Sequence, residues 1–171
     1  MSRVFFYPDY TRYILFTDQA LFHMYAHAQR GRWQKEAGGE MFSSEPHSRG
    51  LVVNTATGPN PSDYRRRCAW NPDVRQSDRN RQVEFAQSRH VVGLWHTHPE
   101  PSPSPSGRDQ STTWEYLDSF KGDLSRYLMV IIGNRGSIPE MAVWVASHQP
   151  MREWTQLGEA LDSETEQAPD K

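Results

Sequence analysis

Two histidines separated by one residue, His96 and His98, end an apolar segment, and a short loop leads from them to Asp109. Side chains alternate across a strand, so imidazoles two residues apart on extended chain point to the same side. Two histidines and a carboxylate, with a fourth position left for water, are typical of catalytic zinc sites. The alternative interpretation is a strand ending in two hydrogen-bonded histidines, followed by a helix that begins with a capping residue.

Other groups that could bind a metal are less well arranged. His23 and His27 lie four residues apart on a predicted helix, but no glutamate stands beside His23 and no third ligand is near. We therefore expect both to be ordinary residues of a helix face. Cys68 is the single cysteine, which excludes an internal disulfide and a zinc site built from several thiolates.

Length and composition predict one ordinary globular domain, since the chain has 171 residues of which 36% are apolar. The first residues show no continuous apolar leader, and the strongly apolar run 127–132 is too short to cross a bilayer. Together with the single cysteine, these features predict a cytoplasmic protein that does not associate with membranes.

The elements that must position the candidate ligands can be read from hydrophobic spacing and turn residues. Strands are expected at 11–16, 36–43, 51–56, 65–70, 90–98, 127–133 and 141–147, and helices at 18–30, 73–89 and 107–120. Ser106 and Asp109 have the spacing of a capping box at the start of the third helix. Two adjacent glycines, Gly38 and Gly39, indicate close approach of another group to the strand that contains them. The order of elements predicts an α/β domain with a mixed sheet and helices on its faces.

Charge is unevenly distributed along the chain, although the net charge is only −2. Residues 152–171 hold six acidic and two basic residues, whereas residues 64–90 are rich in arginine. Arginine suits bidentate contact with carboxylate or phosphate, but a solvated face is the more common reason for such a segment. The overall acidic balance speaks against a nucleic-acid-binding protein, so no nucleic acid partner is expected.

Taken together, the motif residues resemble the JAMM signature of MPN-type (JAB-domain) zinc metalloproteases. The match runs through His96, Thr97, His98 and Pro99, then six residues to Ser106 and two more to Asp109. Upstream, Glu36 is followed by Gly39 and an apolar strand, as is the catalytic glutamate of that family. Glu40 is also nearby, and the family spacing selects Glu36.

The resemblance implies an MPN (JAMM) fold, a cytidine-deaminase-like mixed β-sheet flanked by helices. It also implies one Zn²⁺ held by His96, His98 and Asp109, with Glu36 as general base and Ser106 as a hydrogen-bond donor to the oxyanion. Residues 1–17 would be an N-terminal extension, 18–150 the catalytic domain, and 151–171 an acidic, disordered tail. A true cytidine deaminase is excluded, because that chemistry needs two thiolates for zinc.

Within the family, the chain resembles the prokaryotic branch, and specifically the deconjugating peptidases of bacterial cyclic-oligonucleotide antiphage signalling (CBASS) operons. The implied activity is an isopeptidase that releases a protein, such as a cGAS-like nucleotidyltransferase, conjugated through its C-terminal tail. A peptidase that processes or removes a bacterial ubiquitin-like modifier is the alternative. A non-catalytic MPN scaffold is a third interpretation, against which the complete set of motif residues argues.

Overall fold

The central element is a six-stranded mixed sheet with the strand order β11-β10-β9-β8-β3-β5. The computed structural model describes residues 2–160. The strands are β3 (Gly38–Ser43), β5 (Thr55–Ala56), β8 (His90–Thr97), β9 (Arg126–Ile132), β10 (Met141–Ser147) and β11 (Glu153–Gln156). β8 and β9 are parallel, and the other neighbours that pair with them are antiparallel. This confirms the predicted α/β class with a mixed sheet.

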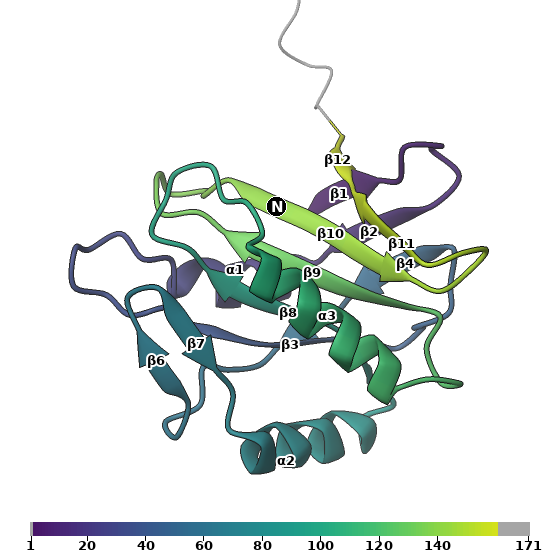
Figure 1. Cartoon of the computed structure of the whole chain (residues 1–171), viewed down its shortest axis with the longest axis horizontal. Coiled ribbons are helices and arrows are strands. Elements are labelled where there is room, and N and C mark those ends of the chain that lie inside the picture. The colour runs from purple at the N-terminus through teal and green to yellow at the C-terminus, as the bar shows by residue number, and fades with distance from the viewer. Residues whose placement is uncertain (1, 161–171) are drawn as a thin grey trace, which may run out of the picture.

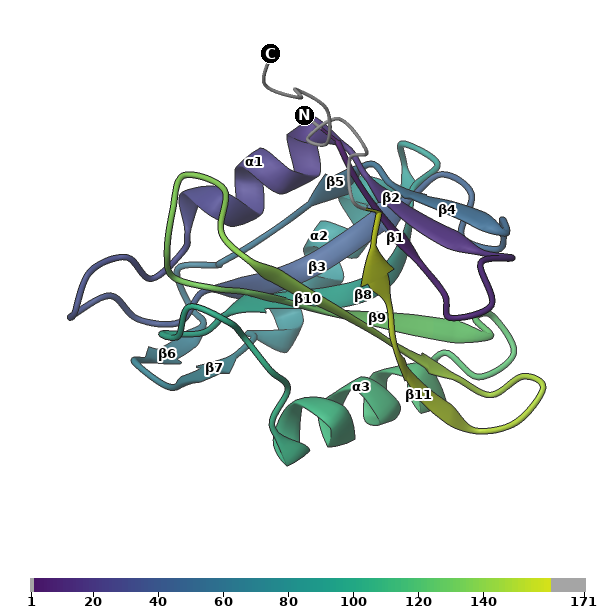
Figure 2. The same cartoon turned by 90° about the horizontal axis from the view of Figure 1, so that it is seen from above.

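Helices lie on both faces of the sheet (Figures 1 and 2). α1 (Asp18–Ala26) covers one face, whereas α3 (Gly107–Ser119) lies over β9 and β10 on the other, and α2 (Val74–Phe85) packs against β3 and β8. Thr17 caps α1 by accepting a hydrogen bond from the backbone of Ala20. α1 ends earlier than the predicted residue 30, because the chain turns after His27.

A second, four-stranded sheet has the order β12-β1-β2-β4. Its strands are β1 (Arg3–Phe6), β2 (Tyr13–Phe16), β4 (Gly50–Val53) and β12 (Gly158–Glu159). The predicted strand 51–56 is thus divided between two sheets, since Asn54 interrupts it and bonds to Phe42 of β3.

Both ends of the described chain are built into this fold, which corrects the expected start of the disordered tail. Residues 1–17, expected as an N-terminal extension, contain β1 and β2, which bury Phe5, Ile14 and Phe16 in the main core. The disordered tail was predicted from residue 151, but β11 pairs with β10 and β12 pairs with β1. The rest of that predicted tail, 161–171, lies outside the described residues.

A short hairpin of β6 (Tyr64–Arg66) and β7 (Ala69–Asn71) stands apart from both sheets. It lies beside the loop between α1 and β3, at the end of the molecule where β8 leads into the loop before α3 (Figures 1 and 2). Within residues 2–160, none of the helices has the length and apolar character needed to span a bilayer.

Candidate metal centre and active site

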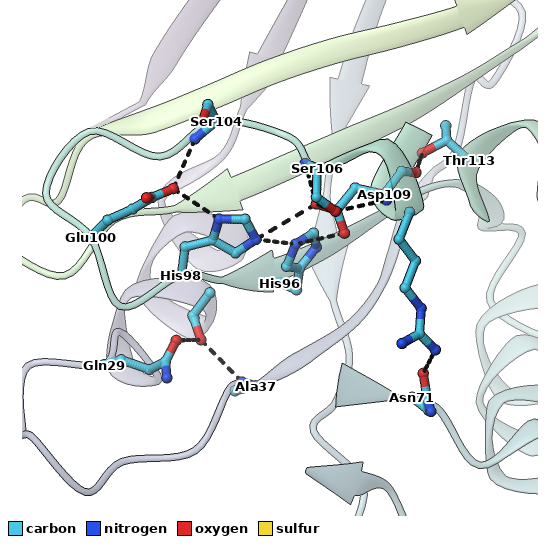
Figure 3. A network of polar contacts seen from close by, with 12 residues as sticks. Gln29, Ala37, Asn71, His96, His98, Glu100, Ser104, Ser106, Asp109 and Thr113 are labelled. Carbon is cyan, nitrogen blue, oxygen red and sulfur yellow. Dashed lines mark hydrogen bonds and ion pairs between the residues drawn. The ribbon is translucent and has the colours of Figure 1, made fainter. Parts of the chain in front are cut away.

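His96 and His98 point to the same side of the chain at the end of β8, as strand alternation predicts. Their Nε2 atoms lie 2.9 Å apart. Asp109, in the first turn of α3, meets both: its Oδ1 is 3.4 Å from Nε2 of His96 and its Oδ2 is 3.7 Å from Nε2 of His98 (Figure 3). These three residues form a group whose ligand atoms all lie within 4.8 Å of one another.

This donor set fits zinc. Four ligands placed tetrahedrally at 2.0–2.2 Å from an ion are separated by about 3.3–3.6 Å, and the three measured separations of 2.9, 3.4 and 3.7 Å lie around that range. Burial lowers the pKa of His96, so its imidazole is neutral near pH 7 and can bind a metal through a free lone pair. Three protein ligands leave one tetrahedral position for water or substrate.

Glu100 orients His98, a contact that the sequence reasoning missed. Nδ1 of His98 lies 3.0 Å from Oε1 of Glu100, which also accepts the backbone N–H of Ser104 (Figure 3). The hydrogen bond from His98 lowers the pKa of Glu100, so the carboxylate stays ionised and Nδ1 must donate. Nε2 of His98 is thereby left as the nitrogen available to a metal ion. The signal in the sequence that could have predicted this contact is the position of Glu100, two residues after His98.

Ser106 fixes Asp109 through the predicted capping box, which the structure confirms. Its hydroxyl oxygen accepts the backbone N–H of Asp109, while its hydroxyl and its own backbone N–H both donate to Oδ2 of Asp109, each at 2.7 Å. The same carboxylate therefore caps a helix and completes the metal group. Its orientation is set before any ion arrives.

Glu36 lies in the same cavity, just before β3. The cavity has a volume of about 460 Å³ and is lined by Glu36, His96, His98, Ser106 and Asp109, among others. Glu36 is only 6% exposed. Burial, reinforced by the negative charge of Asp109 and opposed by Arg108, raises the pKa of Glu36 to about 7. A carboxyl group with this pKa can accept and release protons near neutral pH.

Thr97, between the two histidines, holds the segment that carries Glu36. Its side chain faces away from the metal group, where its hydroxyl accepts the backbone N–H of Ala37 and donates to the buried Gln29. The backbone N–H of Thr97 also donates to the carbonyl of Ala37. β8 and the residue after it thus present the candidate ligands His96 and His98 on one side, while Thr97 on the other side holds the segment next to Glu36.

The two adjacent glycines accommodate the close approach that their position predicts. A Cβ at Gly39 would lie 1.8 Å from the carbonyl oxygen of Thr57, and one at Gly38 would lie 2.6 Å from the ring of Trp70. Trp70 in turn lies nearly parallel to the imidazole of His96, with ring centroids 6.4 Å apart. Gly38 therefore allows Trp70 of β7 to line the site, and Gly39 allows the loop after β5 to pack against β3.

The other residues considered as metal ligands or as the base, His23, His27, Cys68 and Glu40, lie outside the metal group. His23 and His27 pack against the buried ring of Trp95, and Nε2 of His23 contacts the carbonyl of Gly58. Glu40 is buried in an ion pair with Arg81 and does not line the cavity. Cys68 is exposed at the β6–β7 turn and lines the cavity rim without joining the metal group.

An α/β domain whose central strand delivers two histidines to a helix that begins with an aspartate has the architecture of a JAB/MPN-type domain. The model of the family Prok-JAB, prokaryotic homologs of the JAB domain, matches residues 17–154, so the chain belongs to this family. This confirms the JAB/MPN fold predicted from the motif. The family is compatible with a JAMM peptidase and with zinc binding, and it also admits members without catalytic activity.

Two solved structures are similar to this chain. A protein from Desulfitobacterium hafniense is 16% identical, with a TM-score of 0.59, and the match covers 85% of this chain and 88% of that one. A protein from Salinibacter ruber is 17% identical over 81% of this chain and 90% of that one, with a TM-score of 0.45. A search among curated proteins gave no match. The first similarity supports the shared fold and nothing finer.

Proposed function

We propose that this chain is a zinc-dependent isopeptidase that cleaves the bond after the C-terminus of a conjugated protein. The observation that carries the proposal is the convergence of a His₂Asp donor group and a buried glutamate in one cavity. A non-catalytic scaffold has no need for a glutamate with a pKa of about 7 beside such a group. The complete motif and its geometry therefore favour an enzyme.

The residues divide the chemistry among them. His96, His98 and Asp109 would hold the ion, which would supply a Lewis acid able to polarise the scissile carbonyl and acidify water. Glu36, in its ionised form, accepts a proton from the attacking water. The protonated carboxyl then gives this proton to the departing amine, which completes the hydrolysis and restores the base.

Ser106 is the proposed donor to the oxyanion. Its hydroxyl hydrogen points to Asp109 in the structure. For this role, the hydroxyl must rotate toward the substrate oxygen. Asp109 keeps the backbone hydrogen bond from Ser106 when that happens, so the helix cap and the orientation of the ligand survive the rotation. Loss of one such donor typically costs about 2.7–4 kcal/mol of transition-state stabilisation.

The substrate that we propose is a conjugate in which the C-terminus of a cGAS-like nucleotidyltransferase is joined to a lysine of a target protein in the bacterial cytoplasm. This finer proposal rests on the resemblance of the motif segments to CBASS peptidases. The cavity is lined on one side by residues of the loop from Pro99 to Ser106 and on another by β7, so we propose that the substrate tail reaches the site between these segments. A ubiquitin-like modifier is the competing conjugate.

The test is cleavage of defined conjugates by the purified full chain. Metal content is measured by elemental analysis, and the protein is incubated with a nucleotidyltransferase conjugate, a ubiquitin-like conjugate and the matching linear fusions. We expect about one zinc per chain, release of the nucleotidyltransferase, loss of cleavage with a chelator and recovery on adding zinc. Bound zinc without cleavage of any conjugate would leave a non-catalytic scaffold, and faster cleavage of the ubiquitin-like conjugate would reassign the substrate.

A further inference from the structure

Two segments beside the catalytic glutamate carry six basic residues and no acidic ones. The segments are 30–35, before β3, and 64–67, in and after β6. We call their basic side chains the cationic surface: Arg30, Arg32, Lys35, Arg65, Arg66 and Arg67. Five of the six are exposed, and Arg65 is half-buried. Among the described residues, none of the six forms an ion pair.

The cationic surface is continuous with the active site, because backbone contacts join its two segments at Glu36. The backbone N–H of Glu36 donates to the carbonyl of Arg66 at 2.7 Å, and Nε of Arg65 donates to the carbonyl of Glu36 at 2.5 Å. Arg67 donates to the carbonyl of Arg32, which ties the outer ends of the segments together. β7, the strand that pairs with β6, lines the cavity. A chain that enters the cavity on this side therefore passes over the cationic surface.

Two exposed aromatic rings hold cationic groups in place. The guanidinium of Arg32 lies 5.2 Å from the ring centroid of Trp33, and that of Arg66 lies 5.3 Å from the ring centroid of Tyr64. Trp33 is 86% exposed and Tyr64 is 50% exposed. Guanidinium groups fixed in this way lose less side-chain entropy when they bind a carboxylate, so they are suited to recognition.

We propose that the cationic surface recognises an acidic segment of the protein substrate next to the scissile bond. This proposal rests on the proposed function, and it specifies the chemistry of the substrate that the site accepts. Carboxylates match both the charge and the fork geometry of the arginines. Arginine beside exposed aromatic rings is also found in nucleic-acid-binding surfaces. The position next to the proposed peptidase cavity, joined to it through the backbone of Glu36, favours an acidic polypeptide.

The test compares two fluorescent branched peptides that share a lysine-linked tail. One carries Asp and Glu on both sides of the linkage, and its twin carries Asn and Gln at the same positions. We expect the zinc-loaded full chain to bind the acidic peptide about tenfold more tightly at low ionic strength, and we expect this preference to shrink as salt screens the exposed charges. Cleavage of the same pair should differ in KM rather than in kcat.

Matched variants locate the effect. The triple substitution Arg32→Gln, Lys35→Gln and Arg66→Gln should remove the preference. Three other exposed basic residues, Arg49, Lys121 and Arg152, lie in loops at the opposite end of β3, α3 and β10. Replacing these three with Gln changes the net charge equally and should leave the preference intact. The charge reversal Lys35→Glu with Arg66→Glu should shift the preference toward a third peptide, which carries Lys at the positions where the acidic peptide carries Asp and Glu.

Several results would overturn the proposal. Equal binding of the two peptides, or an equal loss of preference in both triple variants, would show that the surface does not read acidic residues. Tighter binding of a single-stranded or duplex oligonucleotide than of the acidic peptide, at the same salt, would assign the surface to nucleic acid. The two proposals can fail separately. If the parent chain and Glu36→Gln both prefer the acidic peptide but the parent chain cleaves neither peptide, the proposed function is contradicted and the role of the cationic surface stands.

Discussion

A single carboxylate, Glu100, decides which nitrogen of His98 faces the metal group. It binds Nδ1 at 3.0 Å and is itself held by the backbone of Ser104. Outer carboxylates of this kind increase the basicity of the histidine and fix its ring. We therefore expect Glu100 to be nearly as important for function as a metal ligand, although its side chain is 45% exposed.

We predict that Glu100→Gln weakens zinc binding about 10–100-fold while leaving the fold intact, because the amide removes the negative charge behind His98. Competition with a chromophoric chelator measures the affinity. Glu115→Gln, on the exposed side of α3, is the matched control. Equal zinc affinity of parent and Glu100→Gln would show that the contact does not tune the site.

The second prediction at this scale concerns Glu36. In the zinc-free protein, burial raises the pKa of this carboxyl to about 7, above the ordinary value of 4.5. Between these two values the folded chain binds a proton that the unfolded chain does not, so ionisation of Glu36 makes stability fall as pH rises through this window. Titration followed by NMR of the carboxyl carbon should give a midpoint near 7, and added zinc should lower it. A midpoint near 4.5 in the zinc-free protein would contradict the burial of Glu36.

At the scale of elements, β8 organises the site because its two faces serve different parts of it. His96 contributes to the metal group, whereas Thr97 holds Ala37 and Gln29 on the opposite side. β3 can approach Trp70 of β7 and the loop after β5 only because its first two residues lack side chains. The separation between base and ligands is therefore set by backbone packing.

We predict that Gly39→Ala strongly destabilises the protein, since the new Cβ would lie 1.8 Å from the carbonyl oxygen of Thr57 and the backbone would have to move. Overpacking of this kind typically costs about 1–3 kcal/mol of folding free energy. Urea unfolding measures the loss. Gly107→Ala is the control, because nothing lies within 4 Å of a Cβ there, and it should be neutral or slightly stabilising. Equal stability of the two variants would contradict the described packing of β3.

The whole molecule depends on strands from both ends of the described chain. β1 joins β2 and β12 in the second sheet, and Phe5 packs against Phe16 with ring centroids 5.7 Å apart. Residues 1–17 should therefore be essential to folding even though the family match begins at residue 17.

We predict that a chain beginning at Asp18 is unfolded or aggregates, because it loses two strands of a four-stranded sheet and exposes the core that they cover. Circular dichroism and thermal unfolding test this, with deletion of 161–171 as the comparison. A chain from Asp18 that unfolds cooperatively with the stability of the full protein would show that β1 and β2 are dispensable.

The sequence was sufficient to predict the metal group, the capping box and the principal strands, because these depend on local spacing. Ligands two residues apart on a strand and a cap three residues before its partner need no knowledge of distant contacts. β1, β11 and β12 were missed because short strands are defined by their partners, which lie far away in the chain. Glu100 and the contacts of Thr97 were missed because they depend on three-dimensional packing.

The central claim is that Glu36 acts as the base beside a zinc ion held by His96, His98 and Asp109. The most direct test measures zinc content and conjugate cleavage together for the parent chain and for Glu36→Gln. We predict that the variant retains about one zinc per chain but cleaves at least about 100-fold more slowly, because it binds the ion without a group that can accept the proton. Full cleavage by Glu36→Gln would contradict this role, and loss of zinc from the variant would show that Glu36 is a ligand instead.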